Sequence, residues 1–459
     1  MNPRRTYFIE TFGCQMNVND SEKVAGLLQR DGYAPAADAR SADLVFLNTC
    51  AVREKAAEKL YHALGRLKRI KEARPEMLIG VGGCVAQLQG TTILERAPHV
   101  DVLVGTHNLG RVPELVAGLG RGARHAVDLD RTADSFAVPD EVVAHSGAVR
   151  AYVTAIEGCN LVCSFCVVPR TRGPEACRPA DAIVAEVRSL VARGYREVML
   201  LGQTVNAYRD RDLDFTDLLA RVDAVPGLVR LRFTTSHPEH VTARMAGALA
   251  DLERLCPYLH LPFQSGSDRI LQSMRRGYTR EEYLLKVEML RRRVKDLALS
   301  SDVIVGYPGE TQADFEATVS LVDQVGFDGL FVFAYSPRPG TTAFRLADDI
   351  PAAEKLRRLQ VLNDAQQRRQ ARRNAELVGR REQVLVEAPG PGGRGMGRTP
   401  QFRIVHLEGA GLAEPRGAAE ERPLLGRLVE VEVTGAGPNS LRARLPTDSL
   451  TRGSAVPIL

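Results

Sequence analysis

Short runs rich in β-branched residues alternate with longer amphipathic stretches along this chain, and the alternation restricts it to α/β architectures. In the first part the strand-like runs are residues 7–9, 44–47, 77–81 and 102–104. In the second part they are residues 151–156, 197–201, 229–233, 258–262, 299–305 and 329–334, separated by helical stretches such as 180–193, 280–295 and 312–325. The pattern predicts two successive α/β units with mainly parallel strands.

The length of 459 residues predicts several domains. Six strand-helix steps joined by right-handed crossovers favour a partial (β/α)6 barrel over a closed eight-stranded one. An Arg-rich helix is expected at 355–381, followed by strand-like alternation at 383–387 and 427–433 that is typical of a small β-barrel able to bind oligonucleotides. The predicted units are an open α/β domain (5–121), a linker (122–144), the partial barrel (145–376) and the small, OB-like β-barrel (378–445).

Composition narrows the class of protein. Hydrophobic residues make up 44% and charged residues 25%, as in ordinary globular proteins, and the net charge of +5 permits a nucleic-acid partner. No apolar run is long enough to span a membrane, and Glu10 interrupts the N-terminal apolar run too early for a secretory signal. We therefore expect a cytoplasmic protein without a membrane partner, in which metal or catalytic roles for the eight cysteines are favoured over a disulfide framework.

Cys159, Cys163 and Cys166 follow the first strand of the second unit. A four-iron cluster normally takes four cysteines, so one held by three thiolates keeps an iron open for a further ligand. The alternative is a zinc knuckle with a distant fourth ligand, but no second Cys-x-x-Cys pair or suitable His follows at zinc spacing. The spacing favours an iron-sulfur site.

Three other cysteines, Cys14, Cys50 and Cys84, each follow one of the first three strand-like runs. Loops after the carboxyl ends of parallel strands form the ligand site of open α/β sheets, so these thiols are expected to converge. The alternative is three buried structural cysteines, since free cysteine is often buried. Three at successive strand ends favour a second thiolate triad.

The loops after the later strands of the partial barrel carry polar or glycine-rich sets, which are expected to face one cavity. The candidate cofactor-binding residues among them are Gly202, Gln203, Ser236 and Gln264. His237 precedes Pro238, so it is either a turn histidine or a ligand.

The spacing of Cys159, Cys163 and Cys166, with Phe165 beside the last cysteine, resembles the radical S-adenosylmethionine (SAM) signature. Other stretches resemble the methylthiotransferases, and within them the branch acting on N(6)-dimethylallyladenosine in tRNA. They are residues 11–21 (TFGCQMNVNDS), 48–54 (NTCAVRE), 83–87 (GCVAQ), 166–169 (CVVP), 232–238 (RFTTSHP), 261–268 (LPFQSGSD) and 335–340 (YSPRPG). The resemblance covers about residues 5 to 445.

The resemblance implies a methylthiotransferase N-terminal domain, a radical SAM core and a C-terminal RNA-binding TRAM domain. Cys159, Cys163 and Cys166 would hold the [4Fe-4S] cluster that cleaves SAM, with Phe165 near the SAM adenine, and the other triad would hold an auxiliary [4Fe-4S] cluster. The implied reaction converts N(6)-dimethylallyladenosine at tRNA position 37, in the anticodon stem-loop, to its 2-methylthio derivative. It would use two SAM molecules, a sulfur atom carried at the auxiliary cluster and a reducing electron donor such as flavodoxin or ferredoxin.

The chain departs from the family pattern at three positions. Arg170 and Cys177 stand where Tyr and Ser are common, and Phe402 replaces the Asn of the TRAM pattern Gly-Arg-Thr-x-x-Asn-Arg, so RNA contacts there are expected to differ. Cys177 and Cys256 match no ligand position and are interpreted as structural.

Other functions stay open at this point. Related enzymes act on threonylcarbamoyl-adenosine or on a ribosomal-protein aspartate, although residues 15–17 and 51–54 look unlike those branches. A non-catalytic RNA-binding protein with redox-sensing clusters, or a zinc-stabilised RNA module, would share parts of the pattern.

Overall fold

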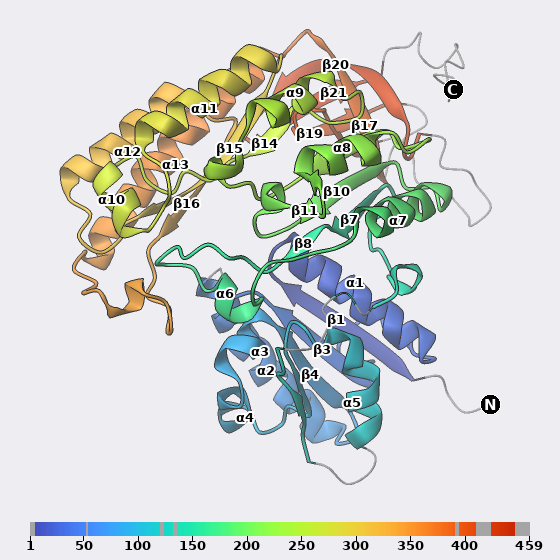
Figure 1. The fold of residues 1–459 in the computed structure, drawn as a ribbon. Helices are drawn as coiled ribbons and strands as arrows, with labels where there is room; N and C mark the ends of the chain where they lie inside the picture. Colours follow the sequence, from blue (N-terminus) through green and yellow to red (C-terminus); the bar gives the residue numbers. More distant parts are fainter. Residues whose placement is uncertain are drawn as a thin grey trace.

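The computed structural model describes residues 5–51, 54–119, 124–131, 136, 138–390, 394–409 and 424–445. Along the chain it contains a parallel α/β sheet, a larger unit of parallel strands backed by helices, and a small β-barrel (Figure 1). This order confirms the predicted fold class.

The N-terminal domain is a six-stranded parallel sheet with the order β2-β1-β3-β4-β5-β6. Its strands are β1 (Thr6–Phe12), β2 (Ala34–Pro35), β3 (Leu44–Thr49), β4 (Leu78–Gly83), β5 (Val102–Val104) and β6 (Ala126–Asp128). Its helices are α1 (Gln15–Arg30), α2 (Glu54–Ala73), α3 (Cys84–Gln89), α4 (Thr92–Arg96) and α5 (Val112–Leu119). Apolar side chains of α2 pack on one face, and those of α1 and α5 on the other.

Two strands of this sheet, β2 and β6, were not expected from the sequence. β2 is two residues long, too short to give a periodic signal. β6 lies inside the interval 122–144 that was expected to be a linker, and it pairs in parallel with β5 at the edge of the sheet. Part of that interval therefore belongs to the N-terminal sheet.

The central unit is a partial barrel made of two three-stranded parallel sheets, β13-β10-β7 and β14-β15-β16. An isolated parallel bridge pairs Leu231 of the first sheet with Leu255, which lies just before β14 of the second. The strands are β7 (Arg150–Thr154), β10 (Glu197–Leu201), β13 (Arg230–Phe233), β14 (Tyr258–His260), β15 (Ala298–Val305) and β16 (Gly329–Ala334). The expected incomplete barrel is confirmed.

Helices cover the outer face of this barrel; α11, α12 and α13 lie along β14–β16 in Figure 1. The helices are α6 (Val168–Thr171), α7 (Ala180–Ala192), α8 (Phe215–Asp223), α9 (Ala243–Asp251), α10 (Asp268–Ser273), α11 (Arg280–Arg293), α12 (Gln312–Val325) and α13 (Ala352–Ala375). Short antiparallel pairs are β8 (Ile156–Glu157) with β9 (Ala176–Cys177), and β11 (Arg209–Asp210) with β12 (Leu213–Asp214).

Alternation along the strands separates an outer from an inner face. On β10, Val198 and Leu200 pack into the main core beneath the helices. Met199 and Leu201 join a different cluster, which contains Met16 of α1 and Phe402. Because successive strand side chains point to opposite faces, Met199 and Leu201 face the lumen of the partial barrel.

The C-terminal domain is a closed barrel with the order β17-β18-β19-β21-β20. Its strands are β17 (Arg381–Gly390), β18 (Arg394–Arg398), β19 (Ile404–Glu408), β20 (Leu428–Ala436) and β21 (Ser440–Arg444). Val384, Val405, Leu407, Val431 and Leu441 fill its centre. The predicted small β-barrel is confirmed.

This small barrel docks beneath the first strands of the central unit through arginines. Arg232 donates hydrogen bonds from Nη1 to the Pro400 carbonyl at 2.7 Å and from Nη2 to the Thr399 carbonyl at 2.9 Å. Arg230 donates to the carbonyls of Arg398 and Gln383. These contacts fix the loop after β18 at the amino-terminal end of the partial barrel.

Phe402 lies inside this interface. Its ring is 5.1 Å from the ring of Tyr258, and the guanidinium groups of Arg150, Arg232 and Arg398 approach its centroid to 5.1, 4.7 and 5.0 Å. Its φ of +70° is the left-handed conformation that Asn adopts more readily than Phe. The replacement of the family's polar residue therefore adds a domain contact at the floor of the lumen.

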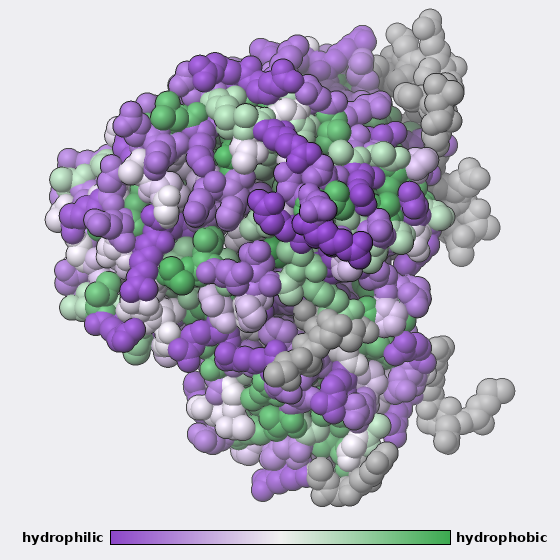
Figure 2. All heavy atoms as spheres, viewed as in Figure 1, coloured by the Kyte–Doolittle hydropathy of each residue, from purple (hydrophilic) through white to green (hydrophobic). Residues whose placement is uncertain are grey.

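Arginines of α13 form ion pairs within the chain. Arg358 binds Glu310 at 2.7 Å, Arg369 binds Asp323 at 2.6 Å and Arg373 binds Asp328 at 3.0 Å. These side chains attach the helix to its neighbours. In the described part of the chain, no helix is both long and apolar enough to cross a bilayer. Hydrophilic residues cover much of the face shown in Figure 2.

Candidate functional site

Cys159, Cys163 and Cys166 lie in the loop after β8. The backbone N–H of Cys159 donates to the Gly173 carbonyl at 3.2 Å, and that of Cys166 donates to the Cys163 carbonyl at 3.1 Å. Gly158 has a φ of +78°, and a Cβ there would lie 2.0 Å from the Pro174 carbonyl oxygen. Only glycine allows this tight approach, which folds the cysteine loop back on itself.

Residues distant in the sequence hold the sulfur atoms of this triad. The Sγ of Cys159 lies 3.4 Å from Thr204 Oγ1, and Nη1 of Arg276 donates to Cys163 Sγ at 3.2 Å. Burial raises the pKa of the Cys159 thiol, and burial together with the charge of Cys163 raises that of Cys166 to about 12. The three thiols converge, and the raised pKa values of Cys159 and Cys166 mean that these two need a compensating positive charge to ionise, which an iron cluster supplies.

Cys14, Cys50 and Cys84 also converge, as predicted from their strand ends. Cys14 immediately precedes α1, Cys50 follows β3, and Cys84 opens α3. A hydrogen bond from Cys50 lowers the pKa of Cys14 to about 6. Burial raises the pKa of Cys84, and the charges of Cys14 and Arg172 also act on it. Within the described part of the chain none of these three cysteines forms a disulfide, and their donor set fits a second cluster with three thiolates.

Asparagines shape the loops around this second triad. Cys14 Sγ donates to Asn17 Oδ1 at 3.4 Å, and Asn17 Nδ2 donates to Asn48 Oδ1 at 3.2 Å. Gly83, with a φ of +88°, packs so closely that a Cβ would lie 2.2 Å from Asn48 Oδ1. This packing brings the ends of β3 and β4 against the start of α1.

Arg172 connects the two triads. It is 2% exposed and forms ion pairs with Asp20 of α1 and with Glu157, two positions before Cys159. Its charge also opposes part of the burial effect that raises the pKa of Cys84. Arg172 therefore binds α1 of the N-terminal domain beside Cys84, and it also binds β8, the strand that leads into the loop of Cys159.

The auxiliary triad borders the barrel lumen. Cys14 packs against the cluster formed by Met16, Met199 and Leu201, the last two of which face the lumen. Tyr152 of β7 packs against the same cluster. The two sets of cysteines therefore approach one lumen, one from the N-terminal sheet and one from the barrel's own first loop.

The predicted cofactor-binding residues lie after the barrel strands. Gln203 Oε1 and Ser236 Oγ are buried with no hydrogen-bond partner among the described residues. Buried polar atoms of this kind usually have partners, so both are available to a ligand. Gln264 has a φ of +66°, and its backbone pairs with Asp302 and Ile304 of β15.

Two other predicted residues make apolar contacts. Phe165 packs against the cluster of Ile270, Met274 and Tyr307. At Gly202 a Cβ would lie 2.2 Å from Ile156 Cγ2, so this glycine allows close packing against β8.

His237 is a buried neutral histidine. Burial and the charge of Arg276 lower its pKa to about 2. Its Nδ1 accepts a hydrogen bond from the Glu239 N–H at 3.3 Å, which leaves the proton on Nε2. Nε2 has no partner within the described residues. His237 therefore caps the turn and also presents a free donor.

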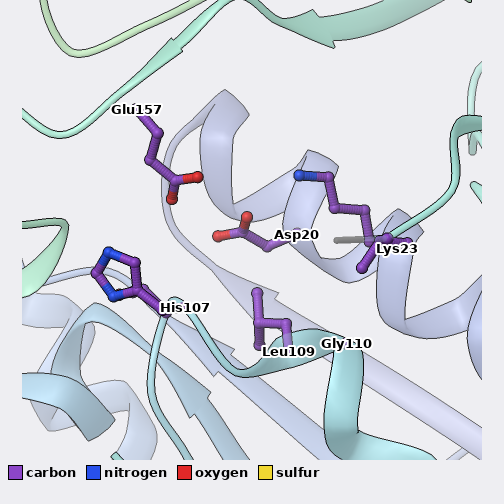
Figure 3. Close-up of a pocket in the computed structure, with 8 residues that line it drawn as sticks. Asp20, Lys23, His107, Leu109, Gly110 and Glu157 are labelled. Atoms are coloured by element: carbon purple, nitrogen blue, oxygen red, sulfur yellow. The ribbon is translucent and has the colours of Figure 1, made fainter. Parts of the chain in front are cut away.

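A small polar pocket lies between α1 and the segment after β5 on one side and β8 on the other (Figure 3). The carboxylates of Asp20 and Glu157 face it, with Lys23 and His107 on its rim. These carboxylates are the partners of Arg172. The pocket is thus part of the buried charge network, and no cysteine is among its lining residues.

The two remaining departures from the family pattern have structural contacts. Arg170 donates from Nη1 to the Gly340 carbonyl at 3.0 Å and so joins the cysteine loop to the loop after β16. Cys177 Sγ accepts a hydrogen bond from the Arg209 N–H at 3.4 Å.

Comparisons with known proteins agree with this architecture. The uncharacterized protein family UPF0004 matches residues 6–105, the radical SAM superfamily residues 153–322 and the TRAM domain residues 375–445. A tRNA-2-methylthio-N(6)-dimethylallyladenosine synthase from Solibacter usitatus is 44% identical over 95% of this chain and 97% of its own length. The chain belongs to the tRNA-2-methylthio-N(6)-dimethylallyladenosine synthase family. A synthase of the same name from Chromobacterium violaceum is 45% identical over 98% of this chain and 99% of its own.

A solved structure has a fold similar to that of this chain. The radical SAM methyltransferase TsrM from Kitasatospora setae superposes with a TM-score of 0.55 at 15% identity, covering 74% of this chain and 77% of that chain. Membership of the radical SAM superfamily implies one [4Fe-4S] cluster and SAM.

Arg172 and Arg276 were not predicted as site residues. Thr204 lies in one of the polar loops expected to face the cavity, but its contact with Cys159 was not predicted. Arg276 lies 113 positions from Cys163, and its sequence neighbours give no sign of a cysteine partner. Arg172 lies near the cysteine motif, but only its buried position between two carboxylates distinguishes it from an ordinary surface arginine.

Proposed function

We propose that this chain is a radical SAM methylthiotransferase that converts N(6)-dimethylallyladenosine at tRNA position 37 to its 2-methylthio derivative. The observation that supports this most is the approach of two cysteine triads to one barrel lumen. A single triad would suit many radical reactions. A second one beside the same lumen suits a reaction that also delivers sulfur.

The proposed ligands are Cys159, Cys163 and Cys166 for the cluster that activates SAM, and Cys14, Cys50 and Cys84 for an auxiliary [4Fe-4S] cluster. When bound, the clusters would supply the electron for SAM cleavage and the sulfur that is transferred. One SAM would give the methyl group, and a second would give the radical that removes the hydrogen of the adenine C2 carbon. An external donor such as flavodoxin or ferredoxin would supply electrons.

The protein's own residues would position and shield these reactants. Phe165, Gly202, Gln203, Ser236 and Gln264 are the proposed SAM contacts, and the two unpartnered polar atoms among them are the ones most in need of a ligand. The TRAM domain would contribute to tRNA binding, since a base in the anticodon loop can be extruded into a pocket more easily than one in a duplex. We place the enzyme in the cytoplasm, where tRNA is modified.

The test uses a bacterial strain that lacks its own methylthiotransferase of this kind. Mass spectrometry of its tRNA nucleosides should show 2-methylthio-N(6)-dimethylallyladenosine when the wild-type chain is expressed, and only the unthiolated nucleoside with Cys163→Ala. Purified, reconstituted protein should form 5′-deoxyadenosine on reduction with SAM. RNA binding without either product would instead indicate a non-catalytic RNA-binding protein.

A further inference from the structure

Two phenylalanines of β16 are exposed on the inner face of the barrel. Phe331 is 53% exposed and Phe333 is 38% exposed. Leu330 and Val332, which alternate with them, pack into the main core beneath the helices. Because strand side chains alternate, Phe331 and Phe333 face the lumen.

The strand register gives this aromatic pair its neighbours. Phe333 lies beside Ile304 of β15, and Ile304 packs in the same cluster as Phe165, next to Cys166. Phe331 lies beside Asp302. The pair therefore extends from the side of the SAM-activating triad toward the floor formed by Phe402.

Polar groups line one edge of the pair. The His260 ring lies 6.1 Å from the Phe331 ring, at an interplanar angle of 66°. His260 Nε2 is 3.5 Å from the Asp302 carboxylate, and its Nδ1 is 2.9 Å from Ser300 Oγ. Apolar rings beside a carboxylate acceptor suit a ligand with a flat or apolar face and an N–H donor.

We propose that Phe331 and Phe333 bind the N(6)-dimethylallyl-adenine base of the substrate and set the enzyme's preference for the prenylated base. This inference rests on the proposed function and deepens it by assigning the substrate subsite. The five-carbon chain or the purine ring lies against the two phenyl rings, as unstacked bases do on aromatic side chains. Asp302 accepts a hydrogen bond from the single N–H that remains on N6.

The same surface discriminates against other modified adenosines. An unprenylated adenine leaves apolar ring surface uncovered, which weakens binding. A threonylcarbamoyl group carries a carboxylate that would lie near Asp302 and apolar rings, where it would be repelled and poorly solvated. The subsite thus separates this substrate from that of the related branch.

The test measures binding of synthetic anticodon stem-loops to the reconstituted holoenzyme by fluorescence anisotropy. The loops carry adenosine, N(6)-dimethylallyladenosine or threonylcarbamoyl-adenosine at position 37. Wild-type enzyme should bind the prenylated loop about tenfold more tightly than the unmodified loop. The double variant Phe331→Ala/Phe333→Ala should bind both loops within about twofold of each other, because the prenylated loop loses the apolar surface that gives it its advantage.

Leu285→Ala is the matched control, because Leu285 is 56% exposed but lies on the outer helix α11; it should retain the preference. A second double variant, Phe331→Leu/Phe333→Leu, keeps apolar side chains and should retain part of it. Iron content and circular dichroism identify variants that fail to fold.

The inference is overturned if a folded alanine double variant keeps the tenfold preference, or if the variants change only the oligomeric state seen by gel filtration. If wild-type enzyme methylthiolates the prenylated loop but the variant keeps its preference, only the subsite assignment fails. If wild-type enzyme forms no methylthio product, the proposed function fails as well.

Discussion

Arg276 donates a hydrogen bond from Nη1 to Cys163 Sγ at 3.2 Å. This bond joins the loop after α10 to the loop that carries the cysteines. Its other nitrogens are also bound: Nε donates to the Tyr278 hydroxyl at 3.1 Å and Nη2 to the Pro262 carbonyl at 3.4 Å. The Tyr278 hydroxyl and the Pro262 carbonyl therefore hold the guanidinium beside the Cys163 sulfur, whether or not the sulfur bond is present. A fixed positive charge and a hydrogen bond at a ligand sulfur both stabilise the more negative, reduced form of a cluster.

Replacing Arg276 should accordingly make the cluster harder to reduce. We expect Arg276→Gln to lower its midpoint potential by about 60 mV, which is a tenfold change for a one-electron couple and corresponds to loss of one charge-assisted hydrogen bond. Potentiometric titration followed by electron paramagnetic resonance measures this shift. Arg275→Gln, in the neighbouring exposed residue, should leave the potential unchanged; equal shifts in both variants would refute a specific role for Arg276.

Removing the auxiliary triad should halve the iron content. The reconstituted wild-type chain is expected to hold about eight irons, and Cys14→Ala/Cys50→Ala about four, because one cluster loses two of its three ligands. Iron analysis and Mössbauer spectroscopy measure the change. Cys256→Ala, which removes a buried cysteine outside both triads, should keep about eight irons. Full iron content in the Cys14/Cys50 variant would sink the auxiliary-cluster assignment.

Glu197 should make the stability of the apo-protein depend on acid pH. Burial alone would raise its pKa, but the charges of Arg232 and Arg150 outweigh burial and lower the pKa to about 2. A carboxyl whose folded pKa lies below its unfolded value of about 4.5 stabilises the fold above that pH, and the contribution is lost as the pH falls toward 2.

The unfolding free energy of the apo-protein should therefore fall by about 3 kcal/mol between neutral pH and pH 2 through this group. Urea titrations across that range measure the fall. Glu197→Gln should be less stable at pH 7 and should lose that part of the pH dependence. An unchanged acid profile in the variant would show that other carboxyls dominate.

Phe402→Ala should loosen the contact between the TRAM domain and the barrel. The substitution removes the contacts of the Phe402 ring with Tyr258 and with three arginines. We expect the free energy of unfolding to fall by about 2 kcal/mol, because the ring is only partly buried. Urea denaturation measures the stability, and small-angle scattering detects a displaced domain. Phe344→Ala, which truncates a ring that is 47% exposed, should have little effect. A similar loss in both variants would contradict the interface role.

Much of the fold followed from local patterns. The six barrel strands were expected within a few residues of their bounds, because buried parallel strands are short, apolar and bounded by turn residues. β2 and β6 were missed: β2 has only two residues, and both lie at the edges of the sheet, where a strand is recognised only by its partner. The expectation that Cys14, Cys50 and Cys84 meet followed from a general property of parallel sheets.

The sequence by itself determined the α/β class, the succession of units, and the two sets of three cysteines with their spacing. Only the tertiary structure decided which side chains surround them: Arg276 at Cys163, Arg172 between Asp20 and Glu157, and the aromatic pair Phe331 and Phe333 in the lumen. The physical reason is that strand and helix periods depend on neighbouring residues. A charge beside a sulfur atom or a ring facing a lumen depends instead on how strands far apart in the sequence are placed side by side.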